Sequence, residues 1–215
     1  MKHRYSLVLS AATVAFALST SALHCQNAKP TNSWSQEDTG RIVSEVQKRI
    51  SGLTDYAVFD WITFGIQGKT LILRGFASRP ILKDEAGRVV KGIPGIESVD
   101  NQIKVLPLSS FDDQIRASVY NRIYTSPSLG MYNAQQGGLR GDFGMRGMAG
   151  GLTNDPPLGY HGIHIIVDNG HVTLYGVVVN SGDATVATMQ ANTAPNVFSV
   201  DNDLMVEGSK SAKQD

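Results

Sequence analysis

Apolar and polar residues alternate along two short segments that share one pattern. Val99–Val105 reads VDNQIKV and Val200–Val206 reads VDNDLMV, and a serine precedes each. The apolar residues and one asparagine fall on alternate positions in both, which is typical of a strand with one apolar face. The chain is therefore expected to be a tandem repeat of one small unit.

A hairpin is predicted before each of these strands. In the second repeat, Ile163–Val167 and His171–Val179 flank Asp168-Asn169-Gly170, and Asn-Gly is a strong signal for a two-residue turn. In the first repeat, Gln67-Gly68 is a weaker turn. We expect Gly75 and Gly176 at equivalent core positions, where a missing side chain lets a helix pack closely. The register gives each hairpin one apolar face, with Ile62, Phe64, Ile66, Leu71, Leu73 and Gly75 in the first and Ile163, Ile165, Val167, Val172, Leu174, Gly176 and Val178 in the second.

Apolar residues recur at helical spacing on both sides of each hairpin. One predicted helix starts near Ser35, and another starts at Ser110, where Asp113 supports an N-cap. The order in each repeat is helix, strand, strand, helix, strand. The predicted fold class is α+β, with two repeated small domains that each have a three-stranded mixed sheet and two helices on one face. The apolar positions of the four helices are Ile42, Val46 and Ile50, then Leu82, Ala86, Val89 and Val90, then Ile115, Val119 and Ile123, and last Val186, Ala187, Met189 and Ala191.

These residues resemble the BON domain family of bacterial periplasmic and outer-membrane-associated proteins. The resemblance rests on Asn169–Gly176 (NGHVTLYG) followed by Val200–Val206, and it covers most of residues 36–107 and 110–207. The first hairpin departs from the second by one additional residue between its turn glycine and Gly75. The resemblance implies a non-enzymatic envelope module that engages phospholipid surfaces or supports other envelope proteins.

The N-terminus predicts export. Residues 1–25 read as a signal peptide, because Lys2, His3 and Arg4 precede an apolar stretch and a group of small residues, with cleavage expected after Ala22. The apolar stretch is short for a membrane span. The expected location is the periplasm or cell envelope, and residues 208–215 form a C-terminal tail.

Charge and cysteine content add two expectations. The 19 basic and 19 acidic residues balance, and removal of Lys2 and Arg4 leaves a net charge of about −2, which gives no global attraction to nucleic acid. Cys25 is the single cysteine, so an intramolecular disulfide is excluded. It has three interpretations: lipidation, which the preceding His24 disfavours, intermolecular pairing, and no role.

A glycine-rich insertion at about residues 125–160 has no counterpart in the first repeat. It is interpreted either as a flexible surface loop or as a mobile binding loop that meets an apolar surface and anionic groups. Its candidate contact residues are Arg140, Phe143, Met145, Arg146 and Met148.

No motif specifies an enzyme, a metal site or a cofactor site. His161, His164 and His171 form the one cluster of metal-ligand type, but the hairpin register separates the last two along the ladder too far to share a zinc ion. There is no Gly-x-Ser-x-Gly elbow. The predicted function is a non-catalytic binding or scaffolding module that contacts anionic phospholipid or envelope proteins. The alternative is a chaperone-like stress protein that binds unfolded clients.

The outer face of the first hairpin is unexpectedly apolar. An exposed apolar patch of this kind marks an interface, and two interpretations remain open. In one, this face packs against the equivalent face of the second domain, formed by His164, Ile166, Tyr175 and Val177. In the other, it contacts a partner or a membrane. Its candidate contact residues are Phe59, Trp61, Ile72 and Phe76.

Asn101 and Asn202 lie on otherwise apolar strand faces. A buried amide needs hydrogen-bond partners, and backbone groups at a helix or strand end can supply them. We therefore expect both asparagines to be structural anchors.

Overall fold

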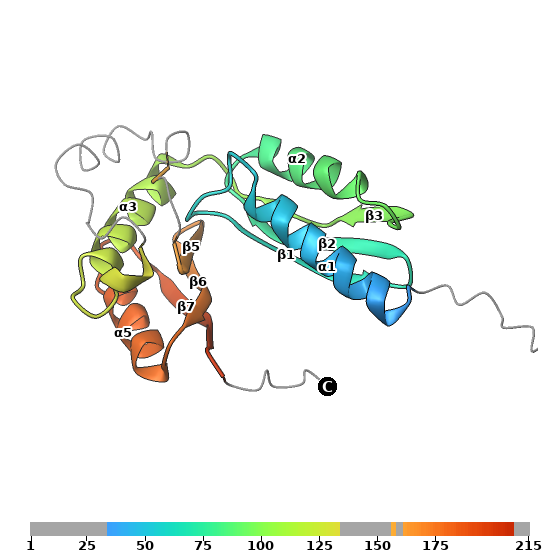
Figure 1. Cartoon of the computed structure of the whole chain (residues 1–215). Helices are drawn as coiled ribbons and strands as arrows, with labels where there is room; N and C mark the ends of the chain where they lie inside the picture. Colours follow the sequence, from blue (N-terminus) through green and yellow to red (C-terminus); the bar gives the residue numbers. More distant parts are fainter. Residues whose placement is uncertain (1–33, 134–155, 158–160, 209–215) are drawn as a thin grey trace, which may run out of the picture. The chain divides into compact units, whose positions relative to one another are not determined.

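The computed structural model describes residues 34–133, 156–157 and 161–208 (Figure 1). Both repeats lie in one compact unit, which begins at Asn32. The predicted signal peptide with Cys25 lies outside the described residues. So do the loop candidates Arg140, Phe143, Met145, Arg146 and Met148.

The first repeat folds as predicted, with two helices on one face of a mixed sheet (Figure 1). β1 and β2 are antiparallel, while β3 and β4 both run parallel to β2. The predicted last strand is thus divided into two short strands. The elements are α1 (Gln36–Ser51), β1 (Trp61–Gln67), β2 (Thr70–Ala77), α2 (Pro80–Lys91), β3 (Ser98–Asn101) and β4 (Lys104–Val105).

The second repeat has the same order, and its last strand is continuous. Its sheet has the order β5-β6-β7, with β5 antiparallel and β7 parallel to β6. The predicted α+β class with two repeated units is confirmed. The elements are α3 (Ser110–Tyr124), the 3-10 helix η1 (Gly130–Tyr132), β5 (Ile163–Asp168), β6 (His171–Val178), α5 (Ser181–Asn192) and β7 (Ser199–Val206).

The hairpin registers have the predicted core faces, but the first turn lies one residue later than predicted. Gln67 pairs with Thr70, so its two loop residues are Gly68 and Lys69. Gly68 takes the left-handed conformation with φ 61° at the first loop position, where the second repeat has Asn169 with φ 53°. The apparent additional residue before Gly75 therefore reflects a glycine at a different turn position, and the two strands match in length.

Gly75 and Gly176 are equivalent, but the predicted reason for them is wrong. Their φ angles are 113° and 130°. A Cβ atom would lie 2.0 Å from the carbonyl oxygen of Trp61 at Gly75, and 2.1 Å from that of Gly162 at Gly176. The backbone of the adjacent strand, rather than a helix, excludes a side chain at both positions.

Side-chain caps define where the helices begin. Ser35 accepts a hydrogen bond from the Asp38 N–H, as expected for an N-cap. The cap of α3 is Ser109 rather than Ser110, because the Ser109 hydroxyl accepts the hydrogen bond from the Asp112 N–H at 3.2 Å.

The two asparagines anchor the last strand of each sheet to a helix, as predicted. The Asn101 amide donates to the Lys83 carbonyl of α2 at 2.8 Å. The Asn202 amide donates to the Ala184 carbonyl of α5 at 3.1 Å and to the Thr188 hydroxyl at 2.8 Å. Each asparagine carbonyl also accepts a backbone N–H two residues later in the chain.

Each repeat has its own apolar core, and the second core also takes residues from the first repeat. Val58 and Phe59, in the loop between α1 and β1, are fully buried among residues of α3, β5 and β6. Among the described residues, no helix is both long and apolar enough to span a bilayer.

Candidate functional site

The predicted aromatic face of the first hairpin packs against the second repeat. The rings of Trp61 and Tyr175 stack, with centroids 5.5 Å apart and planes 7° apart. Phe76 lies 6.1 Å from Tyr175, and Trp61 lies 5.2 Å from His164. The first of the two interpretations, packing between the two outer sheet faces, therefore describes this structure. We call Tyr56, Trp61, Phe76, His164 and Tyr175 the junction cluster.

The expected exposure of Phe59 is wrong. Its side chain is 0% exposed and packs edge-on against Tyr120, with ring centroids 6.3 Å apart. β1 begins at Trp61, so Phe59 lies outside the strand. The alternation that predicted an outward side chain therefore does not extend to Phe59. Ile72 is half-buried on the outer face, as are Trp61 and Phe76.

Two buried titratable groups lie at or beside the junction cluster. Burial lowers the pKa of His164 from its ordinary value of 6.5 to about 4. The carboxylate of Asp60 accepts hydrogen bonds from the Ala57 N–H at 2.9 Å and the Ser78 N–H at 2.6 Å. Burial raises the pKa of Asp60, and these hydrogen bonds oppose the rise. Asp60 thus fastens the loop between α1 and β1 to the end of β2.

The three histidines have three separate environments. The His161 imidazole hydrogen-bonds to the Tyr120 hydroxyl at 3.0 Å, His164 belongs to the junction cluster, and the His171 imidazole hydrogen-bonds to Ser199 at 2.8 Å. Within the described ranges, no group of three or more potential metal ligands is present.

A second aromatic cluster is exposed at the turn end of the second repeat. Phe198 is 67% exposed and Phe111 is 38% exposed, with ring centroids 5.9 Å apart. The His171 ring lies 5.9 Å from that of Phe198. We call Phe111, His171 and Phe198 the turn patch. Leu108, three residues before Phe111 in the chain, is 74% exposed.

The backbone beneath the turn patch is held in place by a buried carboxylate. Asp112, 0% exposed, accepts hydrogen bonds from the N–H groups of Asn169 at 3.1 Å and Gly170 at 2.8 Å. Gly170 has φ 83°, and a Cβ there would lie 2.7 Å from the Phe198 ring. The patch is therefore supported by the first turn of α3 and by a glycine that lets the Phe198 ring lie against the turn.

Sequence reasoning missed the turn patch because its residues are far apart in the chain. A usable signal was present, since Phe198 directly precedes the strand that pairs with β6, which places it next to the β5–β6 turn.

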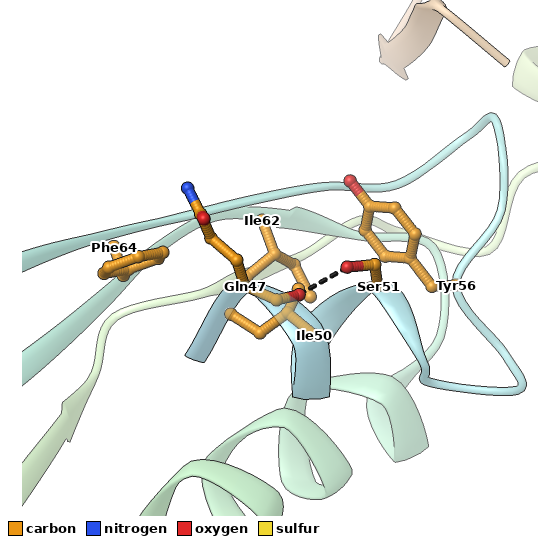
Figure 2. A pocket seen from close by; sticks show the side chains of 6 residues that line it. All are labelled: Gln47, Ile50, Ser51, Tyr56, Ile62 and Phe64. Atoms are coloured by element: carbon orange, nitrogen blue, oxygen red, sulfur yellow. Dashed lines mark hydrogen bonds between the residues drawn. The ribbon is translucent and has the colours of Figure 1, made fainter. Parts of the chain in front are cut away.

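Two surface pockets lie at the sides of the two sheets. One has a volume of about 180 Å³ between α1 and β1, and Figure 2 shows its lining of Gln47, Ile50, Ser51, Tyr56, Ile62 and Phe64. The other has a volume of about 550 Å³ on α5 and β7, with a lining of Thr185, Thr188, Met189, Asn192, Thr193 and Asn202.

Comparison with known proteins identifies the repeats. The BON domain family matches residues 65–107 and 150–208. No curated protein matches the chain. Two solved structures of CdsD, a structural protein of the type III secretion system of Chlamydia trachomatis, are similar at 16% identity, each with a TM-score of 0.25. One covers 77% of this chain and 92% of its own, and the other, a C-terminal domain, covers 80% and 99%.

Proposed function

The chain belongs to the BON domain family and carries two BON domains, and on this premise we propose that it is a non-catalytic envelope module that contacts phospholipid surfaces. The family is one of binding domains that are thought to engage phospholipids, and its members are typically periplasmic or envelope-associated. We place this chain in the periplasm or envelope after removal of the proposed signal peptide. We assign its domains to residues 36–107 and 110–207.

The observation that carries this proposal is the exposed turn patch. Phe111 and Phe198 present two aromatic rings to solvent on a backbone that Asp112 holds in place. Burying a fully exposed phenylalanine side chain contributes about 1.5 to 3 kcal/mol, and because Phe198 is 67% and Phe111 38% exposed, the two rings together contribute roughly that amount. A binding free energy of about 4 kcal/mol corresponds to a Kd near 1 mM, so the contact is weak and reversible unless other groups add to it.

The candidate residues of the glycine-rich insertion are proposed to supply the additional contact. Arg140 and Arg146 would meet anionic head groups, each worth about 1 kcal/mol near an anionic surface. Phe143, Met145 and Met148 would enter the apolar region. Partner contact is also proposed for the exposed parts of three half-buried side chains, Ile72, Trp61 and Phe76.

The test is co-sedimentation of residues 26–215 with anionic and with neutral vesicles, at low and at moderate salt. We expect binding to anionic vesicles that weakens with salt. Phe198→Ser should reduce binding to both vesicle types, whereas Arg140→Ala with Arg146→Ala should reduce the salt-sensitive part. Met189→Ser is the matched control, because Met189 is 62% exposed on α5, outside the turn patch.

Two outcomes would contradict the lipid proposal. If Phe198→Ser leaves vesicle binding unchanged, the turn patch is not the surface that contacts lipid. No binding to either vesicle, together with suppressed aggregation of an unfolded client protein, would favour the chaperone-like alternative instead.

A further inference from the structure

We propose that the groove between α1 and the edge strand β1 binds an extended polypeptide segment, which adds to the sheet as a strand and places an apolar side chain in the pocket of Figure 2. This site is separate from the turn patch. It therefore does not depend on the proposed contact with lipid.

The free edge of β1 carries backbone groups that point away from the sheet. β1 pairs with β2 alone, and Gln67 and Thr70 flank a two-residue loop as a hydrogen-bonded pair. Hydrogen-bonded and non-hydrogen-bonded pairs alternate along an antiparallel ladder, so the N–H and C=O groups of Ile62, Phe64 and Ile66 face outward. In the part of the chain that the structure describes, no hydrogen bond to the N–H of Phe64 or Ile66 is found. Such an edge accepts an added strand.

The equivalent edge of the second repeat is already occupied. Ile163 and Ile165 correspond to Ile62 and Phe64, because they pair with residues at the same places in the matching strand. The Ile165 N–H donates a hydrogen bond to the Val58 carbonyl at 2.8 Å. The Tyr124 hydroxyl donates to the Ile163 carbonyl at 2.5 Å. On β1, by contrast, only the Ile62 backbone has such a partner, the Tyr56 hydroxyl, and no hydrogen bond to the Phe64 N–H is found among the described residues.

The segment that occupies the β5 edge also contributes an aromatic side chain. Phe59 follows Val58, and both are fully buried in the second core, where Phe59 packs edge-on against Tyr120 of α3. The chain therefore contains an example of how this fold covers such an edge. One backbone carbonyl bonds to the strand, and the next side chain packs against the neighbouring helix.

Two small or polar residues leave the first groove open. The buried series Ile42, Val46 and Ile50 of α1 corresponds to Ile115, Val119 and Ile123 of α3, so Gln47 and Ser51 take the places of Tyr120 and Tyr124. The Ser51 hydroxyl donates to the Gln47 carbonyl within the helix (Figure 2) and does not reach the strand. The loss of two tyrosine rings accounts for the pocket of about 180 Å³. A cavity of about 150 Å³ in another protein holds a benzene molecule, so the pocket suits one aromatic ring.

The pocket is continuous with the contact between the repeats. Tyr56 lines the pocket, and its ring lies 5.5 Å from that of His164 in the junction cluster. At the other end of the strand, Ile66 is 36% exposed and extends the apolar edge. The chemistry of the occupant follows from the β5 edge: an extended segment with a β-branched residue followed by an aromatic one, as in Val58-Phe59. Val58 and Phe59 of a second folded copy are buried and cannot reach this groove, and we assign the groove to an extended segment of another protein with this pattern.

The probe is a synthetic peptide with the sequence of residues 55–60 (DYAVFD), titrated into residues 26–215 and followed by amide chemical shifts. We expect saturable shifts at the N–H groups of Phe64 and Ile66 and in the last turn of α1. The same peptide carrying Phe59→Ser should bind at least tenfold more weakly. Absence of saturable shifts at Phe64 up to millimolar peptide, or shifts that map elsewhere, would overturn the proposal.

Variants of the protein test the pocket itself. Ser51→Tyr introduces the side chain of the second repeat, should fill the pocket, and should weaken peptide binding at least tenfold. Ser44→Tyr adds the same side chain at an exposed position of α1 and is the control. Gln47→Tyr is the second pocket-filling variant, in case one of the two is poorly folded. Equal affinity for the pocket-filling variants and the control would exclude this groove, while Phe198→Ser should leave peptide binding unchanged.

Discussion

The stacked pair Trp61 and Tyr175 should couple the two repeats energetically. Replacing a fully buried tryptophan by alanine costs about 3 to 5 kcal/mol, and because Trp61 is half-buried we expect Trp61→Ala to cost about 2 kcal/mol. For a protein of this size, each kcal/mol lowers Tm by about 2 to 4 °C, so the expected decrease is about 4 to 8 °C. The geometry of the pair, 5.5 Å between centroids and 7° between planes, is that of a stacked pair worth about 0.5 to 1.5 kcal/mol.

A double-mutant cycle isolates this interaction. Urea unfolding of Trp61→Ala, Tyr175→Ala and the double variant should give a coupling free energy of about 1 kcal/mol. Ile72→Ala is a suitable comparison, because Ile72 is half-buried on the same face of the first sheet and lies four residues before Phe76 in β2. A coupling below about 0.3 kcal/mol, with unchanged Tm for Trp61→Ala, would refute the packing argument and favour partner contact as the role of Trp61.

Three further predictions concern buried polar groups and glycine. The folded-state pKa of His164 is about 4, below its ordinary value of 6.5. Its contribution to the free energy of unfolding is therefore complete above pH 6.5 and decreases as the pH falls towards 4, by at most about 3 kcal/mol. The pH dependence of urea unfolding should flatten in His164→Gln. Asp112→Ala leaves the buried N–H of Gly170 and the partly buried N–H of Asn169 unbonded and should cost about 2 to 3 kcal/mol in the same assay; a loss below about 0.5 kcal/mol would mean that the turn does not need this carboxylate. Gly176→Ala should lose more than about 3 kcal/mol and fold poorly, because its Cβ would lie 2.1 Å from a carbonyl oxygen, whereas Gly65→Ala meets nothing within 4 Å and should change stability by less than about 0.5 kcal/mol in a thermal melt.

Local patterns were sufficient to predict the repeat, the hairpin faces and the asparagine anchors. Alternation and helical spacing are short-range signals, and Asn101 and Asn202 stood out because a polar amide interrupted an apolar face. The register of the second hairpin followed from its Asn169-Gly170 turn. In the first hairpin the predicted core face holds although the turn was misplaced, because moving the loop by one residue shifts the pairing by two and leaves each side chain on the same face. The cap of α3 and the first turn were each misplaced by one residue, because two serines compete at the helix start and Gly68 accepts either turn position.

Features that depend on contacts between segments far apart in the chain could not be read from such patterns. Phe59 lies outside the alternating segment, and its burial depends on a loop that crosses to the second repeat. The turn patch requires Phe111 and Phe198 to meet through the packing of α3 beside the hairpin, which neither segment encodes by itself. Local patterns left both interpretations of the aromatic face open, and the position of Tyr175 opposite Trp61 separates them.

The positions at which the two repeats differ show where each has specialised. The second repeat fills the space between its first helix and edge strand with Tyr120 and Tyr124, and it accepts Val58 from the preceding repeat on that edge. The first repeat has Gln47 and Ser51 instead, and no earlier repeat is available among the described residues to cover β1. An uncovered edge strand beside an apolar pocket is a liability for aggregation, and natural proteins usually blunt such an edge with charge, proline or a covering segment. β1 contains neither a charged residue nor a proline, so its sequence does not protect the edge against aggregation. A second polypeptide that covers β1 in the cell would account for this uncovered edge.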